Sequence, residues 1–253
     1  MNRNDKDLLF EFVKTDFTLR YNNSMLGFLW AVLKPLFMFS VMYLVFSFLM
    51  GDSIKYYSLY LLMGIFMYNF FQEVTTNGLN SLLQKKDIIL KVNFKRYLAV
   101  IGSTLIAGIN LGFNLLVSIV FFAFNHLLPS PQGILFFLLS IVILYILALA
   151  IAFFISILYV KFRDLQHIWE ILMLIFFYLT PIIYPISIIK GKFSLIIYAN
   201  PLTHIFTFGR DVLIYGKFSS VLSTSIILVA SIILLFLGIL FFQKNIKKIA
   251  EEF

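Results

Sequence analysis

The chain has 253 residues, of which 61% are hydrophobic and only 13% are charged, with a formal net charge of +8 and no cysteine. Soluble domains contain about 45–50% apolar and about 25% charged residues, so this composition excludes a soluble globular fold and predicts an integral membrane protein. The absence of cysteine excludes disulfides and thiol chemistry.

Residues 5–22 are predicted to form an amphipathic helix in the plane of the membrane surface. Charges recur throughout this segment, so it is neither a signal peptide nor a span. Its polar residues fall on one narrow stripe at 100° per residue, and hydrophobic residues cover most of the remainder. Asp16 and Arg20 lie on the apolar side with the spacing and order that favour a helical ion pair. With Tyr21, they are candidates either for anchoring the helix or for contacting a cytoplasmic partner.

Six segments contain the roughly 20 mostly apolar residues that a helix needs to cross a bilayer. They are residues 25–50, 56–77, 97–124, 133–160, 168–184 and 221–242. Their apolar runs are continuous and do not alternate with polar residues, which favours helices over the strands of a barrel. The second segment is the weakest, since Gln72 and Glu73 interrupt it. The sequence therefore predicts one all-α membrane domain, residues 1–253, with six transmembrane helices.

The distribution of basic residues predicts the orientation. Fifteen of the 20 Lys and Arg residues precede or begin the first span, or lie in the second and fourth connections and the carboxyl-terminal tail. Lys and Arg are concentrated on the cytoplasmic side of membrane proteins. Both termini are therefore expected in the cytoplasm. Because the membrane topology accounts for the basic residues, they give no reason to expect a nucleic-acid partner.

Residues 185–218 are predicted to form an external gate segment of short re-entrant or interfacial helices. Pro181 and Pro185 interrupt the fifth span near its outer end. Asn200-Pro201 supplies a cap and a first-turn proline for a new helix. Backbone that leaves a helix at membrane depth must be covered by protein or line a cavity. We interpret the segment as a lid over an exit path, with an ordinary packed loop as the alternative.

The sequence shows no motif or residue grouping typical of an enzyme active site. It has no Gly-x-x-x-x-Gly-Lys-Ser/Thr motif, and its largest predicted cytoplasmic connection, residues 72–96, is too small for a nucleotide-binding domain. Its three histidines show no metal-ligand spacing, so no metal site is expected. Glu73 and Glu170 fall near cytoplasmic ends of spans, which disfavours proton coupling without excluding it. We therefore expect a non-enzyme without a cofactor of its own.

Aromatic residues form stripes on two of the predicted spans. The stripe on the fifth span, at spacings of three and four, consists of Trp169, Met173, Phe176, Thr180 and Tyr184. On the first span, one face carries Phe28, Phe39, Tyr43 and Phe46, and another carries Trp30, Phe37 and Phe48. Spacing alone leaves open which of the two faces inward. Aromatic rings beside a pathway can stack on sugar rings while hydroxyl groups form hydrogen bonds. An aromatic stripe on a membrane helix is, however, more often explained by packing or lipid contact.

Short motifs follow one another along the whole chain. They are Arg20-Tyr21-x-x-Ser24-x-Leu26-Gly27-x-Leu29-Trp30-x-x-Leu33-x-Pro35, Asn69-Phe70-Phe71, Asn77-Gly78-x-Asn80-Ser81-Leu82, Phe162-Arg163-Asp164, Thr180-Pro181-Ile182-x-Tyr184, and Asn200-Pro201 with Arg210-Asp211. In this order the motifs resemble the permease subunits of type-2 ATP-binding-cassette exporters of bacterial polysaccharides, namely O-antigen, capsule or teichoic acid. Lys95 departs from the pattern, since many relatives carry proline there.

The resemblance implies a homodimer around a central conduit in the cytoplasmic (inner) membrane, with two copies of a separate ATPase that bind ATP and Mg. It implies that the ATPase contacts short cytoplasmic helices, here Gln84, Lys85, Lys86, Asp87, Arg163 and Asp164. It also implies that aromatic residues of the first and fifth spans line the conduit, here Phe39, Tyr43, Trp169, Met173, Phe176, Thr180 and Tyr184. The hypothesis is export of a lipid-linked polysaccharide; a drug exporter, a proton-coupled carrier, and an ATP-independent channel or scaffold are the alternatives.

Overall fold

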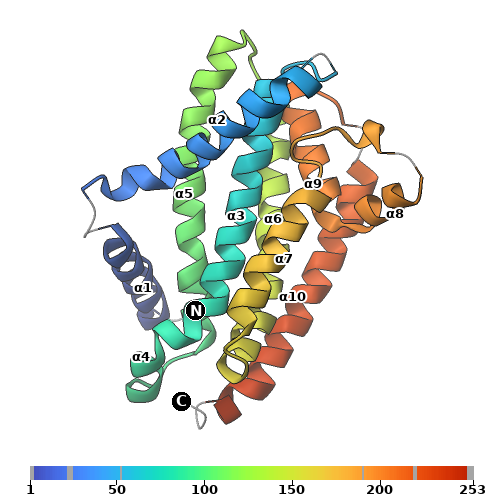
Figure 1. Ribbon diagram of the computed structural model, residues 1–253. Helices are drawn as coiled ribbons and strands as arrows, with labels where there is room; N and C mark the ends of the chain where they lie inside the picture. The colour runs from blue at the N-terminus through green and yellow to red at the C-terminus, as the bar shows by residue number, and fades with distance from the viewer. Residues whose placement is uncertain (1–2, 22–24, 52, 190, 219–220, 250–253) are drawn as a thin grey trace.

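The computed structural model describes residues 3–21, 25–51, 53–189, 191–218 and 221–249. Within these ranges the regular structure is entirely helical, which confirms the predicted all-α class (Figure 1). The last residue of the predicted interfacial helix, at position 22, lies outside the described residues.

The long helices agree closely with the predicted segments, and short helices lie between them. In chain order the elements are α1 (Arg3–Tyr21), η1 (Gly27–Leu29), α2 (Trp30–Met50), α3 (Tyr57–Gln84), α4 (Lys86–Lys91), α5 (Tyr97–Phe124), α6 (Pro131–Lys161), α7 (Leu165–Leu179), η2 (Ile186–Ile188), α8 (Lys192–Ala199), α9 (Pro201–Arg210), the π-helical turn η3 (Asp211–Tyr215) and α10 (Val221–Ile249). The short helices expected before the last span are therefore present as α8 and α9.

The predicted number of six spans is not confirmed. In the described part of the chain, four helices are long and apolar enough to cross a membrane: Gly27–Met50, Tyr97–Phe124, Pro131–Lys161 and Val221–Ile246. The helix α3 has 28 residues, but its tyrosines, asparagines and glutamines make it less apolar. The helix α7 has 15 residues and ends at Leu179, five residues before the predicted end of the fifth span. Pro181, which cannot continue a helix, follows after Thr180.

The helix α3 lies at the centre of the bundle. It packs against α5 and α6 on one side and against α2, α7 and α9 on the others (Figure 1). Its amino-terminal half is mostly apolar around the whole circumference, and the side chains of Leu59, Leu61, Leu62 and Ile65 are completely buried. A helix that is hydrophobic all round belongs in a protein interior. The apolar part of α3 is thus the core around which the other helices assemble.

The helices α3 and α6 meet closely at Gly78. A Cβ atom added there would lie 2.3 Å from the Cβ atom of Ala152 and 3.2 Å from its Cα atom. Small residues allow helix backbones to approach in this way within membranes. The contact explains why glycine occupies this position of a helix, where it otherwise lowers stability.

Replacing Gly78 with alanine is expected to destabilise the protein by about 1–3 kcal/mol, because the added methyl group forces α3 and α6 apart. Gly112 provides the matched control, since a Cβ atom on this helical glycine meets nothing within 4 Å. Gly112→Ala should leave stability unchanged or slightly raised. Thermal melting of the two detergent-solubilised variants measures the difference, and equal melting temperatures would contradict the packing argument.

Candidate functional site

The interfacial helix α1 is joined to the bundle by ion pairs. The ammonium group of Lys85 donates to the carboxylate of Asp16 at 2.5 Å and to the Ser103 hydroxyl at 2.6 Å. Nearer the amino terminus, Lys95 pairs with Asp5 at 2.6 Å. The expected pair between Asp16 and Arg20 within the helix is wrong, since both side chains pair across to other elements.

The position of Lys85 differs from that of the other residues predicted to contact an ATPase. Its side chain is only 4% exposed, and its ammonium group lies 5.3 Å from the centre of the Phe12 ring. Burial lowers the pKa of Lys85, and the hydrogen bond to Asp16 opposes this shift. Lys85 therefore faces α1 and the interior of the chain. It connects α1 to the junction between α3 and α4 rather than presenting a charge to a partner.

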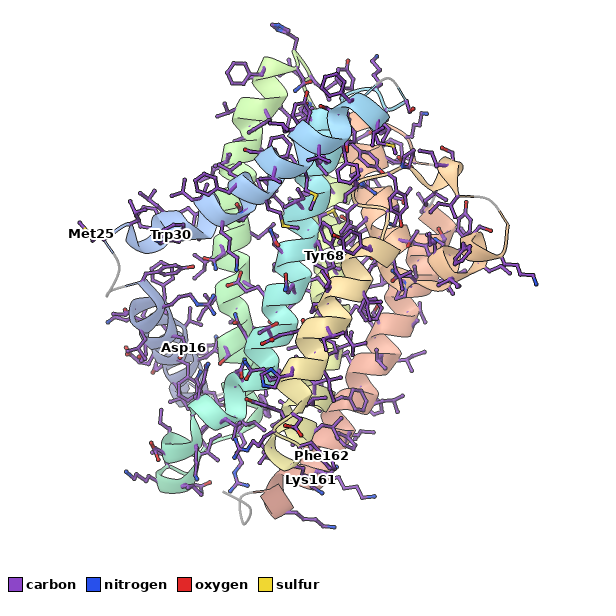
Figure 2. All side chains as sticks on the ribbon, viewed as in Figure 1. Asp16, Met25, Trp30, Tyr68, Lys161 and Phe162 are labelled. Carbon is purple, nitrogen blue, oxygen red and sulfur yellow. The ribbon has the colours of Figure 1, made fainter. Side chains whose placement is uncertain are left out.

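The remaining predicted coupling residues lie near one end of the bundle. Gln84 and Asp87 are exposed and Lys86 is half-buried, at the start of α4. Arg163 and Asp164 are exposed in the turn between α6 and α7, directly after Lys161 and Phe162 (Figure 2). This end of the bundle is also the one at which α4 and both chain ends lie (Figure 1). The structure thus brings the two predicted coupling elements to the same side of the molecule.

Arg20 and Tyr21 close a polar cluster on the inner half of α3. Arg20 forms an ion pair with Glu73, and its second guanidinium nitrogen donates to Asn77 at 2.7 Å. The Tyr21 hydroxyl donates to Asn110 of α5 at 3.0 Å, and the Asn110 amide donates to Glu73 at 2.6 Å. Asn110 is buried and Glu73 is partly buried, and polar groups removed from water need such partners. The three predicted residues of the interfacial helix, Asp16 included, therefore fix its position against α3 and α5.

This cluster borders a cavity of about 620 Å³ between α1, α2, α3 and α5, which we name the inner cavity. Its lining residues are Arg20, Tyr21, Gly27, Trp30, Ala31, Lys34, Pro35, Met38, Asn69, Gln72, Glu73, Thr76, Asn77 and Asn110. The cationic side chains of Arg20 and Lys34 and several amides face it, beside the partly exposed indole of Trp30. The cavity combines an aromatic ring with donors and acceptors, as a site for a polar ligand requires.

The sequence analysis missed the stripe of polar residues that forms one wall of the inner cavity. This α3 polar stripe consists of Asn69, Gln72, Glu73, Thr76 and Asn77. The residues follow one another at helical spacings of three and four, so they share one face of α3. The sequence contained this signal. Gln72 and Glu73 were interpreted as interruptions of a span, whereas a polar stripe on an apolar helix indicates a face turned toward water or another polar surface.

The predicted stripe on α7 is mostly enclosed by the chain itself. The indole nitrogen of Trp169 donates to Thr75 of α3 at 3.3 Å, and the Tyr68 hydroxyl of α3 donates to the backbone oxygen of Met173. Trp169 is 7% exposed and Met173 is 1% exposed, while Phe176 is half-buried. The free face of α7 is the opposite one, with Ile168, Ile171, Leu174, Ile175 and Tyr178.

The outer end of the stripe belongs to a segment without helical structure. Thr180 is buried and accepts a hydrogen bond from the Asn200 amide at 3.0 Å, while Tyr184 donates to the backbone oxygen of Tyr178 at 2.6 Å. Asn200 also caps α9, accepting from the Leu202 backbone at 3.0 Å. One asparagine therefore joins the broken end of α7 to the start of α9, in agreement with the cap expected at Asn200-Pro201.

Arg210, at the end of α9, binds the freed carbonyl groups of this segment. Its guanidinium donates to the backbone oxygens of Pro181 at 2.6 Å and Ile182 at 3.4 Å. The hydroxyl of Tyr60 donates to Pro181 and to Tyr184 at 3.2 and 2.9 Å. Arg210 is 1% exposed and stacks on the Tyr60 ring at 3.8 Å. Non-helical backbone in a membrane protein must be satisfied by such partners.

The two predicted residues of the first span lie in a series of stacked rings. Phe39 is 6% exposed and packs edge-on against Phe121 of α5, with ring centres 5.2 Å apart. Tyr43 is 39% exposed and stacks on Phe39 at 5.5 Å. The series continues from Tyr43 to Tyr57 at 6.1 Å and from Tyr57 to Tyr60 at 6.5 Å. Of the predicted pair, Tyr43 is the one with a substantial free surface.

No group of three or more His, Asp or Glu residues that could hold a metal ion is found among the described residues. The site residues described above supply ion pairs, amides and aromatic rings. These groups can bind and orient a ligand, and the residues brought together contain no nucleophile–base pair of the kind that covalent catalysis uses.

Comparison with known proteins shows the family of the chain. The family model described as "ABC-2 type transporter" matches residues 8–214. Two proteins named "O-antigen export system permease protein RfbA" from Klebsiella pneumoniae are similar to the chain, at 31% identity over 245 residues and 30% over 249, each covering 97% of this chain and 94% of the relative. A protein of the same name from Myxococcus xanthus is 25% identical over 249 residues, covering 98% of this chain and 95% of the relative. The chain therefore belongs to the ABC-2 type transporter family.

Proposed function

We propose that the chain is the transmembrane subunit of an exporter that moves a lipid-linked polysaccharide across the cytoplasmic membrane, powered by a separate ATPase. The observation that carries the proposal is the similarity, over nearly the whole length, to three permeases whose names state O-antigen export. The absence of a nucleotide-binding motif from the sequence agrees with an ATPase on another polypeptide.

The ATPase contacts the end of the bundle at which α4 and the α6–α7 turn lie. Asp87, Arg163 and Asp164 are exposed there and form its attachment surface. Lys85 does not belong to this surface and instead links two parts of the chain. Because Lys85 binds Asp16, a movement of the α3–α4 junction carries α1 with it. Since α1 also borders the inner cavity through Arg20 and Tyr21, the same movement changes the shape of that cavity.

Two copies of the chain form the conduit between them. The free apolar faces of α2 and α7 are large, and they include Phe37 at 60% exposure and Ile171 at 60%. The inner cavity and the α3 polar stripe supply the polar part of the conduit wall, where sugar hydroxyl groups form hydrogen bonds. Trp169, Met173 and Thr180 join this wall only when α7 moves away from α3, because their side chains are buried in the present conformation.

The proposal is tested by purifying the chain together with its cognate ATPase in lipid nanodiscs and measuring ATP hydrolysis. A lipid-linked glycan should stimulate hydrolysis, and the same lipid carrier without sugar should not. Small hydrophobic compounds serve as a second control. Stimulation by such compounds and not by any glycolipid would replace the proposal with export of a drug-like substrate, and failure to assemble with an ATPase would refute both.

A further inference from the structure

A second cavity, which we name the outer cavity, lies at the end of the bundle opposite α4. It has a volume of about 670 Å³ and is enclosed by the α2–α3 connection, the start of α3, the end of α9 and η3. The side chains important to its chemistry are Lys55, Tyr56, Thr207, Asp211, Tyr215 and Lys217. Nothing in the transport cycle described above uses these residues.

The backbone around the outer cavity is unusual in three places. Tyr56 has φ +60°, in the left-handed region that non-glycine residues rarely adopt. Residues Asp211–Tyr215 form a π-helical turn, and Gly216 follows with φ +63°. The Tyr215 hydroxyl donates to the backbone oxygen of Lys55 at 2.9 Å and so joins the two segments. Left-handed non-glycine residues and π-helical turns both concentrate at binding sites.

Two polar groups that line the outer cavity have no hydrogen-bond partner among the described residues. The hydroxyl oxygen of Thr207 is buried and unpaired. The carboxylate of Asp211, which is half-buried, accepts no hydrogen bond from a described residue. Arg210 directs three of its five N–H groups to the backbone oxygens of Pro181, Ile182 and Phe206. A buried polar group without a partner lowers stability unless a ligand satisfies it.

We propose that the outer cavity is a saccharide-binding site that holds a segment of the exported glycan as it leaves the conduit. The carboxylate of Asp211 and the hydroxyl of Thr207 accept hydrogen bonds from sugar hydroxyl groups. The rings of Tyr56 and Tyr215, both partly exposed, provide apolar faces for the sugar rings. The inference rests on the proposed function, because that function supplies the glycan.

The charged residues that line the cavity are Lys55, Lys217, Arg210 and Asp211. Lys55 lies over the Tyr56 ring at 4.9 Å and Lys217 over the Tyr215 ring at 5.9 Å, so both cations are held by aromatic faces. The carboxylate of Asp211 lies within electrostatic reach of Arg210 and Lys217, and it can accept hydrogen bonds from hydroxyl groups. A ligand that both donates and accepts hydrogen bonds and has apolar faces satisfies all of these groups. A sugar has these properties.

The series of rings described above connects the outer cavity with the predicted conduit residues. It runs from Phe39 and Tyr43 on α2 through Tyr57 to Tyr60, which lines the cavity beneath Arg210. Neighbouring rings in this series are nearly parallel, with interplanar angles of 20° to 24°. The side of α2 that was predicted to face the glycan therefore leads to the outer cavity.

The test is a titration of the complete exporter, with its ATPase in nanodiscs, using lipid-free oligosaccharides of mannose, galactose, rhamnose and N-acetylglucosamine as probes. At least one probe should bind. Thr207→Val should weaken its binding about three- to tenfold and Asp211→Asn about tenfold or more, as expected for a neutral and a charged hydrogen bond. Thr203→Val is the matched control: Thr203 lies one turn earlier on α9 with an equally unpaired buried hydroxyl, but it does not line the cavity.

Glycolipid-stimulated ATP hydrolysis on the same samples separates the two proposals. If the glycolipid stimulates hydrolysis but no oligosaccharide binds, or if Thr207→Val and Asp211→Asn bind like the wild type, the outer cavity is no saccharide site and the proposed function stands. If neither stimulation nor binding is observed, both proposals are refuted. Equal losses in Thr203→Val and Thr207→Val would assign the effect to helix α9 and overturn the site.

Discussion

Replacing Arg210 with methionine is expected to destabilise the protein by about 2–4 kcal/mol, since one backbone carbonyl loses its donor and a second loses one of two. These are the oxygens of Pro181 and Ile182, in the segment where α7 ends. Methionine fills a similar volume without donating, so the loss reports the hydrogen bonds. Thermal melting of the purified variant measures the effect, together with the amount of protein that elutes as one species.

Two further variants distinguish this explanation from a general effect of removing charge. Arg163→Met removes an exposed arginine from the α6–α7 turn and should leave the melting temperature unchanged. Arg210→Lys keeps the charge but loses the planar group that reaches two carbonyls at once, so it should fall between wild type and methionine. A melting temperature for Arg210→Met equal to that of Arg163→Met would contradict the assigned role of Arg210.

Replacing Lys85 with methionine should cost about 3 kcal/mol, the lower end of the range for breaking a buried ion pair, because Asp16 retains some contact with water. The side chains of Lys85 and Asp16 are 4% and 19% exposed. The loss leaves the Asp16 carboxylate with the neutral donor Ser103, at 3.2 Å, and breaks the link between the middle of α1 and the α3–α4 junction. The melting temperature measures the stability, and limited proteolysis within α1 reports its detachment.

A double-mutant cycle isolates the Lys85–Asp16 pair. Asp16→Asn and Lys85→Met together should be less destabilising than the sum of the single changes, because the double variant buries no unpaired charge. Additive effects would show that the two residues do not interact. In the complete exporter, Lys85→Met should also reduce the stimulation of ATP hydrolysis by substrate, since α1 no longer follows the α3–α4 junction.

The helical architecture could be predicted because it depends on local composition. The bounds predicted for residues 97–124 coincide with α5, an uninterrupted apolar segment whose ends are marked by polar residues. The end of α7 near Pro181 and the start of α9 at Pro201 follow from the covalent limits of proline. In these places the chain itself determines where a helix starts or stops, and no tertiary contact is needed.

The packing of the helix faces could not be predicted in the same way. Spacing shows that Trp169, Met173 and Phe176 share a face of α7, but that face and the opposite one are both apolar. Which of them is covered depends on Thr75 and Tyr68 of α3, about 100 residues earlier. A sequence without a polar–apolar contrast around a helix contains no local signal for its orientation.

The burial of two charged residues could not be predicted for a related reason. Lys85 and Arg210 were counted with the basic residues of the loops, as cations in a membrane protein generally are. Each is buried because of partners distant in sequence, Asp16 in one case and the carbonyls freed near Pro181 in the other. The polar residues of α3 did contain a usable signal in their helical spacing, and that signal locates the inner cavity.

The central claim is that a separate ATPase drives this chain from the end formed by α4 and the α6–α7 turn. Because the sequence contains no cysteine, a single introduced thiol can be addressed without background. The decisive measurement is cross-linking of the assembled exporter through Asp87→Cys, Arg163→Cys or Lys192→Cys with a short thiol–amine reagent. The account predicts cross-links to the ATPase from the first two positions and none from Lys192 on α8. Cross-links from Lys192, or none from Asp87→Cys and Arg163→Cys in an intact complex, would contradict it.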